Sequence, residues 1–177
     1  MQERNYLRRE INKKSCLVLT LFALVFIYPY AYANIDNQQD INVEADSLQF
    51  NNETKVGIYQ GHIKLTQGSR ILTADYATSY SNPAGEILKI IASGHPAVYH
   101  ALVFHKHPKL IATGNTIYYY PLTDYLEAVG NAQIIQGQNH FQGPQINYDF
   151  KKKTVASPLS KEGHTQITLA PLQALHS

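Results

Sequence analysis

The segment GIYQGHIKLTQG, residues 57–68, decides the fold. After Gly61, apolar Ile63 and Leu65 alternate with polar neighbours, and a period of two is typical of a strand with one buried face. Glycine accepts a positive φ that other residues avoid, so Gly61 suits a corner at which the chain changes direction. The segment therefore predicts strand-like pieces joined at a bend.

A repeated signature extends this pattern along the chain. Each copy is a glycine, a polar residue and a short strand, and the copies begin at Gly61, Gly94, Gly130 and Gly163. These glycines stand 33, 36 and 33 residues apart, and regular spacing indicates a repeat architecture. The alternative is an ordinary β-sandwich with unrelated glycines, which four near-equal copies disfavour.

A second signature lies between those glycines. It reads Ala45-Asp46, Ala74-Asp75 and Gly114-Asn115, with a weaker copy at Gly143-Pro144. Asp and Asn also suit corners, because their side chains bond the nearby backbone. We therefore predict an all-β fold of stacked, V-shaped antiparallel strand pairs, with two facing sheets around an apolar interior. The open ends of such a stack carry unpaired backbone groups, so we expect them to be assembly surfaces.

The first 33 residues predict a secretory signal peptide. Residues 1–15 hold five Lys/Arg against two Asp/Glu, and residues 16–27 form an uncharged apolar run. Ala31-Tyr32-Ala33 then supplies the small residues of a cleavage site, so we expect cleavage after Ala33. The alternative is an uncleaved membrane anchor, but the apolar run has 12 residues and a spanning helix needs about 20.

The chain that remains after cleavage is nearly neutral. It holds ten Lys/Arg and eleven Asp/Glu, a net charge of −1, which argues against nucleic acid as a partner. The same balance argues against docking on an anionic membrane by bulk charge. Cys16 is the chain's one cysteine and leaves with the signal peptide, so we expect neither a disulfide nor thiol chemistry.

Five stretches of the sequence form a recognisable series: INVEADSL (residues 41–48), GIYQGHIKLTQG (57–68), LTADY (72–76), LEAVGNA (126–132) and GPQINY (143–148). Together they resemble the OstA-like family of lipopolysaccharide transport proteins. Each motif is short, but their order and spacing are specific, and the resemblance spans about residues 41–169. It implies an open, twisted β-jellyroll over residues 41–169. Flexible segments are expected at residues 34–40 and 170–177.

The resemblance also implies a function and a set of partners. Members of the family hold the lipid A part of lipopolysaccharide between their sheets and work in the periplasm. They are expected to join end to end with themselves, with an LptC-like inner-membrane protein and with the N-terminal domain of an LptD-like outer-membrane protein. The chain carries no nucleotide motif, so an ATP-driven partner is expected to supply the direction of transport.

A carrier of this kind needs apolar side chains on its inner faces, because acyl chains bury about 0.8 kcal/mol per CH₂. Some of these side chains only fill the core, and the sequence does not separate lining from packing. The residues predicted to face inward and contact lipid are Leu48, Phe50, Ile58, Ile63, Leu65, Leu72, Ile90, Val98, Ile117, Tyr119, Ile134, Phe141, Ile146 and Tyr148.

Two clusters of polar residues have both a functional and a plainer structural interpretation. Lys151-Lys152-Lys153 could meet lipid phosphates, but a lysine run is more often a solvated turn, and we predict a hairpin turn. His95, His100, His105 and His107 lie within 13 residues. Without a cysteine or a metalloprotease motif nearby, we expect no metal and no cofactor.

Catalysis has little support in the sequence. Asp46 and Asp75 could form a carboxylate pair, but their corner positions favour turn formation. No nucleophile elbow, phosphate loop or dinucleotide motif is present, so we predict a non-enzymatic protein. The alternatives are an anchored LptC-like scaffold, if the signal stays uncleaved, and a periplasmic hydrolase or carbohydrate-binding β-domain. The absence of Trp argues against a sugar-stacking site.

Overall fold

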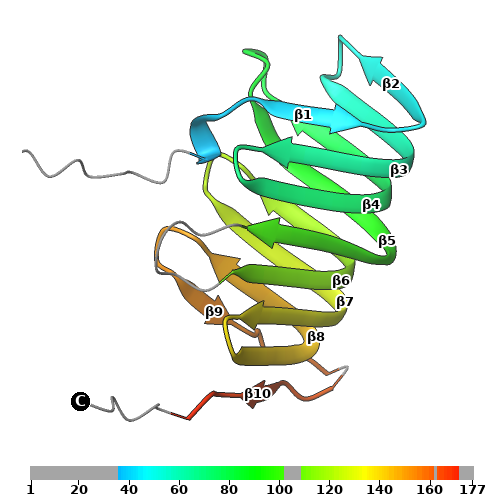
Figure 1. Ribbon diagram of the computed structural model, residues 1–177. Coiled ribbons are helices and arrows are strands. Elements are labelled where there is room, and N and C mark those ends of the chain that lie inside the picture. The colour runs from blue at the N-terminus through cyan, green and yellow to red at the C-terminus, as the bar shows by residue number, and fades with distance from the viewer. Residues whose placement is uncertain (1–35, 102–108, 162, 172–177) are drawn as a thin grey trace, which may run out of the picture. The chain divides into compact units, whose positions relative to one another are not determined.

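Strands make up most of the described chain (Figure 1). The computed structural model describes residues 36–101, 109–161 and 163–171, so the predicted signal peptide and residues 172–177 of the predicted tail lie outside this part. The elements are η1 (Asp36–Gln38), β1 (Ile41–Glu44), β2 (Ser47–Asn51), β3 (Val56–Gln67), β4 (Arg70–Ser81), β5 (Ile87–Ala101), β6 (Leu110–Tyr120), β7 (Tyr125–Gln136), β8 (Asn139–Asp149), β9 (Thr154–Ala156) and β10 (Gln166–Thr168). No helix in this part is long and apolar enough to cross a membrane.

The strands form one continuous antiparallel sheet that is folded into two walls. β3 to β8 pair in sequential order; β1 and β2 pair with opposite ends of β3, and β10 and β9 with opposite ends of β8. The β1 wall comprises β1, β10 and residues 63–67, 70–74, 97–101, 110–114, 132–136 and 139–143. The β2 wall comprises β2, β9 and residues 56–60, 76–81, 87–93, 116–120, 125–129 and 145–149.

Each long strand bends where it passes from one wall to the other, and Figure 1 shows these bends along the right-hand margin. The pairing register shifts at every bend, for example between Gln60 and Ile63 of β3. The predicted corner residues that lie at these shifts include Gly61, Asp75, Gly94, Asn115 and Gly130. The predicted corners and the open β-jellyroll architecture are therefore confirmed.

Strands β3 and β7 turn the corner with two successive residues of positive φ. Gly61 and His62 have φ values of 75° and 44°, and Gly130 and Asn131 have values of 74° and 51°. This pair preserves the phase of the strand, so odd-numbered residues of β3 face inward on both sides of the corner. Only glycine reaches the first of these conformations without strain.

Strands β4, β5, β6 and β8 turn the corner by changing phase. In β4, even-numbered residues 70–74 are buried before the corner and odd-numbered residues 77–79 after it. Two successive exposed residues, Asp75 and Tyr76, separate the two sets. Because the walls meet at an angle, this change of parity keeps the apolar side chains of both halves inside.

The core lies between the two walls as a single cluster. Its members are mostly Ile, Leu, Ala and Tyr, and Tyr99, Tyr119, Leu126 and Ile134 are fully buried. The sequence predicts a flexible segment at residues 34–40, but Asp36–Gln38 instead form η1, and the Asp36 side chain is buried. The N-terminal segment is thus part of the folded unit from residue 36 onward.

The corner of β3 depends on close approach as well as on φ. A Cβ on Gly61 would lie 2.9 Å from Asp46 Cγ and 3.0 Å from Asp46 Cβ, whereas a Cβ on Gly85 would meet nothing within 4 Å. Both glycines have positive φ, so alanine at either site costs about 1–2 kcal/mol of backbone strain. We expect Gly61→Ala to lower the free energy of unfolding, measured by urea denaturation, by more than Gly85→Ala. Equal losses would show that Asp46 simply moves aside.

Candidate functional site

The inner surface of the two walls holds most of the residues predicted to face inward. The buried members of that set are Ile63, Leu65, Leu72, Ile90, Ile117, Tyr119, Ile134, Ile146 and Tyr148. Phe141 is partly buried and packs against the same core. Their inward orientation is established, and their contact with lipid stays a prediction.

The inward orientation predicted for Ile58 and Val98 is wrong. Ile58 lies between buried Gly57 and buried Tyr59, so strand alternation turns it to the outer face. Val98 likewise lies between the buried residues 97 and 99 of β5. Both are partly exposed apolar residues on the outside of the walls.

Leu48 and Phe50 lie on the inward face of β2, as predicted, but are not buried. They pair with Tyr59 and Gly57, two inward residues, yet 59% of Leu48 and 49% of Phe50 is exposed. They are exposed because β2 is the last strand of its wall. At the other end of the stack, Ile167 of β10 pairs with inward Phe141 and is 56% exposed. Both ends of the interior therefore present apolar side chains to solvent.

The same ends carry free strand edges. Among the described residues, β1 and β2 pair only with β3, and β9 and β10 pair only with β8. The outer edges of these four strands therefore present N–H and C=O groups that the rest of the sheet does not use. Such edges are suited to strand addition.

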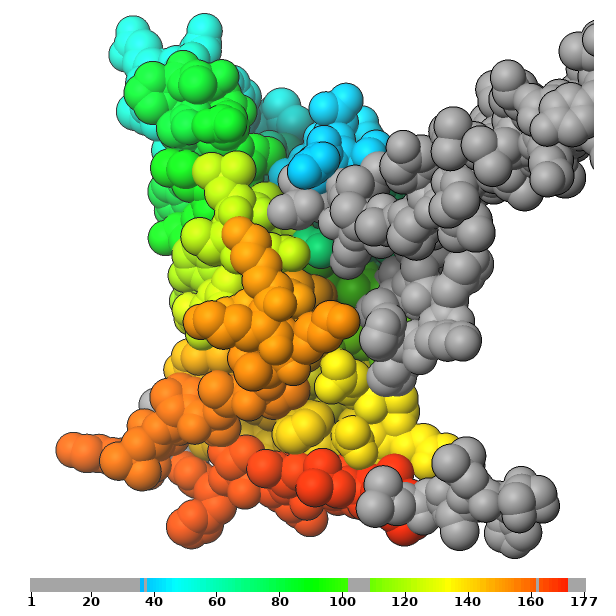
Figure 2. Space-filling model, turned by 90° about the vertical axis from the view of Figure 1, so that its left-hand side faces the viewer, coloured from blue at the N-terminus to red at the C-terminus, as the bar shows by residue number. Residues whose placement is uncertain are grey.

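The margin opposite the corners is closed by turns, and we call it the seam. It consists of η1, the β3–β4 turn at residues 68–69, the β6–β7 turn at 121–124 and the β8–β9 turn at 150–153. Figure 2 looks onto this side and shows the yellow-green β6–β7 turn beside the orange β8–β9 turn. Lys151 Nζ donates a hydrogen bond to Leu122 O at 3.3 Å, which joins these two turns.

A buried guanidinium ties the walls together at the seam. Arg70, at the start of β4 in the β1 wall, is 1% exposed. Its Nη1 donates to Asp124 Oδ1 at 2.5 Å and to Tyr119 Oη at 2.8 Å, and its Nη2 lies 3.3 Å from Asp124 Oδ2. Tyr119 Oη in turn donates to Gln67 Oε1 at 2.7 Å. The two walls are therefore joined here by side chains instead of backbone pairing.

The N-terminal segment supplies a second carboxylate to Arg70. Asp36 Oδ1 accepts from Ser69 N at 3.1 Å, and Asp36 Oδ2 accepts from Ser69 Oγ at 2.6 Å. Asp36 Oδ2 also lies 3.8 Å from Arg70 Nε, close enough for an ion pair but too far for a hydrogen bond. Gln67 Nε2 donates to Gln39 O at 3.2 Å and holds the next residues.

Aromatic rings surround this charged group. The Phe150 ring lies 4.7 Å from Arg70 Cζ, and it contacts the rings of Tyr99 and Tyr148 at centroid distances of 5.7 and 4.7 Å. Burial lowers the pKa of Arg70 and is the largest single influence on it, but the hydrogen bond to Asp124 and the electrostatic interactions with Asp124 and the neighbouring tyrosines together hold the Arg70 pKa above its ordinary value. Burial raises the pKa of Tyr99 and of Tyr119, so both remain neutral.

The sequence contained one signal for this network. Arg70 has the same parity as Leu72 and Ala74, so alternation alone places an arginine inside the walls. Asp124 carries no comparable signal, because an Asp after Pro121, Leu122 and Thr123 is read as a turn residue. The pairing of the two residues, 54 positions apart, is visible only in the structure.

The lysine cluster forms the hairpin turn that the sequence predicted. Residues 150–153 connect β8 to β9, and Lys152 Nζ lies 3.3 Å from Asp149 Oδ2. Together with the bond from Lys151 to Leu122, these contacts give two of the lysines a role in the turn. Contact of the cluster with lipid phosphates stays a prediction.

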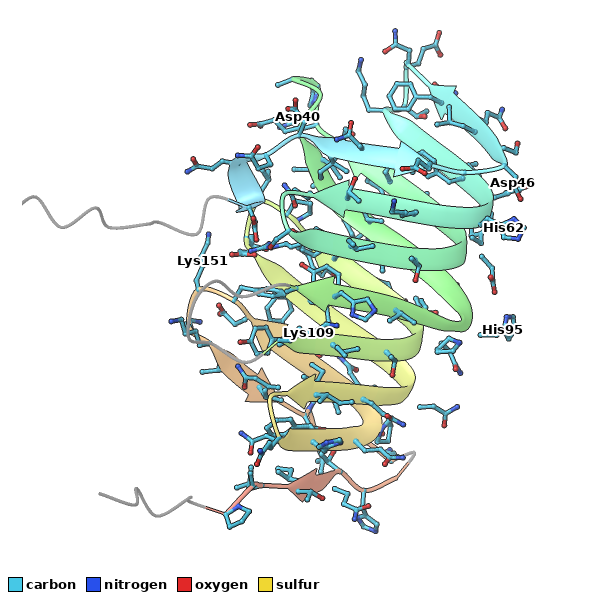
Figure 3. The ribbon with its side chains drawn as sticks, in the orientation of Figure 1. Asp40, Asp46, His62, His95, Lys109 and Lys151 are labelled. Atoms are coloured by element: carbon cyan, nitrogen blue, oxygen red, sulfur yellow. The ribbon has the colours of Figure 1, made fainter. Side chains whose placement is uncertain are left out.

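The corner margin carries two exposed His–Asp pairs. His62 Nδ1 lies 2.7 Å from Asp46 Oδ2, and His95 Nδ1 lies 3.0 Å from Asp75 Oδ2. Figure 3 shows His62 and His95 on this margin, opposite Lys109 and Lys151 on the seam side. His105 and His107 lie outside the described residues. Among the described residues, no three potential metal ligands come together.

A polar hollow of about 420 Å³ lies at the C-terminal end of the corner margin. Its lining comprises Gly130, Asn131, Gln142, Gly143, Pro144, Gly163, His164 and Gln166. These residues are mainly amides and backbone groups, and none of the predicted lipid-contacting residues is among them. The hollow is therefore separate from the apolar interior and does not suit an acyl chain.

The chain matches one family of known proteins over most of its described length. Residues 42–154 match the family described as LptA/(LptD N-terminal domain) LPS transport protein. Lipopolysaccharide export system protein LptH of Pseudomonas aeruginosa is 32% identical over 120 residues, covering 68% of this chain and 69% of that protein. Lipopolysaccharide export system protein LptA of Escherichia coli K12 is 26% identical over 165 residues, covering 92% and 88%.

A solved structure shows the same fold. The crystal structure of Pseudomonas aeruginosa LptH aligns with a TM-score of 0.70 and 28% identity. The alignment covers 77% of this chain and 99% of that one. That protein is described as the LptA homologous periplasmic component of a conserved lipopolysaccharide transport device.

We expect the buried ion pair at the seam to contribute more to the free energy of unfolding than the exposed pairs do. Asp124 has a φ of 59°, which Asn tolerates, so Asp124→Asn removes the charge with little added strain. Because this leaves the Arg70 guanidinium buried without its main carboxylate, we expect a loss of about 3–5 kcal/mol in the free energy of unfolding. Asp46→Asn, which breaks an exposed pair, is the matched control and should change stability little. Urea denaturation measures both, and equal effects would contradict the assignment.

We expect the exposed histidine His62 to have a raised pKa. The hydrogen bond and charge of Asp46 raise the pKa of His62 above 6.5, whereas burial lowers the pKa of His100. Because the folded state favours protonated His62, its small stabilising effect is present below pH 6.5 and is lost as the pH rises through the raised pKa. NMR titration should show this order, and Asp46→Asn should lower the pKa of His62 alone. An unchanged His62 titration in that variant would refute the pairing.

Proposed function

The chain belongs to the LptA/(LptD N-terminal domain) family of LPS transport proteins, and on this premise we propose that it carries lipopolysaccharide across the periplasm as a component of an export system. Its relatives are described as lipopolysaccharide export system proteins, which favours transport over the anchored scaffold and the carbohydrate-binding domain considered as alternatives. The protein acts by binding, and no step of the proposal requires catalysis.

One observation supports the proposal most directly: the apolar interior between the walls reaches solvent at both ends. Leu48 and Phe50 expose inward-phase side chains at the β2 end, and Ile167 does so at the β10 end. An interior that were only a core would be expected to be covered at its ends by polar residues or a further element. Open apolar ends instead allow acyl chains to pass from one interior to the next.

The energetics of lipid carriage require such an interior. Each CH₂ of an acyl chain that leaves a membrane loses about 0.8 kcal/mol, so a carrier must offer comparable burial. The described interior is filled, since Tyr99, Tyr119 and Ile117 are completely buried. We therefore expect lipid to enter by parting the walls, which are tied by side chains at the seam but by the continuous backbone of each long strand at the corners.

The free strand edges support the proposed partners. We propose that β1 and β2 of one copy add to β9 and β10 of the next, so that the walls and interiors continue from copy to copy. The same edges would receive an LptC-like inner-membrane protein at one end and the N-terminal domain of an LptD-like outer-membrane protein at the other. A chain of this kind bridges the two membranes without leaving its lipid exposed.

The lipid-contacting residues are open to a direct test. We expect photoreactive residues introduced at Phe50, Ile63 and Ile117 to crosslink to lipopolysaccharide in the purified protein, because they line the interior. Ile58 and Val98 are matched controls, since they are apolar residues of the same strands or walls that face outward. Probes at those positions should remain unlabelled.

Two outcomes of the crosslinking experiment would contradict the proposal. Labelling of Ile58 and Val98 as strong as that of Ile63 would show lipid adhering to the outer surface and would refute an interior site. No labelling at any position in a protein with the circular dichroism of the native fold would remove the case for lipid carriage.

A further inference from the structure

The turn between β3 and β4 forms a small anion cradle at the seam. Three donors from Ser69 and Arg70 converge on the carboxylate of Asp36: Ser69 N, Ser69 Oγ and Arg70 Nε. Gly68 makes room for it, because a Cβ on Gly68 would lie 3.1 Å from the Cα of Asp36. The cradle therefore admits a carboxylate only because this turn begins with a glycine.

The cradle is incompletely satisfied by Asp36. Arg70 Nε is buried and has no hydrogen-bond acceptor among the described residues, since Asp36 Oδ2 lies 3.8 Å away. A buried donor without an acceptor costs free energy, and a guanidinium edge is shaped for two oxygens of one oxyanion. A phosphate presents three acceptor oxygens and would reach Arg70 Nε and the two Ser69 donors together.

Asp36 is held outside the sheet. It lies on η1, and its described contacts to the rest of the protein are those with Ser69 and Arg70. The first strand pairing begins at Ile41 with Gln67. Asp36 can therefore leave the cradle without breaking any pairing of the sheet, whereas Asp124 is fixed within the β6–β7 turn.

We propose that Arg70 and Ser69 form the phosphate-binding site of the lipid carrier, and that Asp36 occupies this site until a phosphate on the lipid replaces it. The inference rests on the proposed function and adds the position of the headgroup. The seam is the boundary at which the apolar interior, with Phe150 and Tyr119 around Arg70, meets water. A lipid whose acyl chains lie between the walls would present its phosphates there.

The test compares two lipids that differ only in phosphate. Binding of bisphosphorylated lipid A and of its dephosphorylated form is measured with the folded protein, and the ratio of the two affinities is the readout. We expect the unmodified protein to prefer the phosphorylated lipid by at least about tenfold, the effect of one charge-assisted contact. Equal affinities would overturn the phosphate site, whereas a protein that binds neither lipid would overturn the proposed function itself.

Three variants test which residues cause the preference for phosphorylated lipid. Arg70→Met combined with Asp124→Asn removes both charges of the buried pair together, so it should keep the fold better than either change alone and bring the ratio close to one. Asp36→Ala removes the occupant of the cradle and should raise the ratio several-fold, which a purely structural role of Asp36 would not do. Asp46→Asn, an exposed carboxylate on the corner margin, should leave the ratio unchanged. An unchanged ratio in the first two variants would refute the proposal.

Inorganic phosphate distinguishes a lipid headgroup site from a site for the free ion. A headgroup site gains most of its affinity from the attached acyl chains, so millimolar inorganic phosphate should leave the preference for phosphorylated lipid intact. If free phosphate at that concentration abolishes the preference, the cradle binds the ion and not the lipid, and the assignment to lipid is wrong.

Discussion

Every long strand of this protein must keep its apolar side chains inside two walls that meet at an angle. A regular strand cannot do this, because its side chains alternate strictly between two faces. The chain meets the constraint in two ways: β3 and β7 place a glycine and a second residue of positive φ at the corner, and the other long strands change parity across two successive residues at the corner. The common register of these bends makes one continuous sheet enclose an interior.

The two margins of the molecule are built from different forces. At the corners the walls are joined by the covalent backbone of β3 to β8, because each of these strands passes from one wall into the other, so this margin cannot come apart. At the seam the walls meet through Arg70, Asp124 and their neighbours, in a network of side chains with one poorly satisfied donor. The weaker closure therefore lies on one side only, and separation of the walls there would leave the corners intact.

The sequence predicted the local features of this fold and missed the contacts between distant segments. Gly61 and Asp75 were found because glycine and aspartate at a corner have local conformational reasons. Ile58 and Val98 were placed on the wrong face, because apolar character alone does not set the phase of a strand that has outward apolar residues. Asp124 and Asp36 went unnoticed as partners of Arg70, since their role depends on how the walls close and not on neighbouring residues.

The uniform bend of β3 to β8 has a consequence for how such proteins change over evolutionary time. Each pair of strands is a hairpin with one corner per strand, and its neighbours meet it through the same cross-section. Gain or loss of a whole hairpin would therefore lengthen or shorten the apolar interior by about 10 Å, twice the spacing of adjacent strands, and leave both terminal edges unaltered. Loss of a single residue at a corner would instead shift the alternation in half of the strand, so that its apolar side chains would face outward. The length of such a fold therefore changes in steps of one hairpin, and each step leaves the first and last strands of the sheet in place.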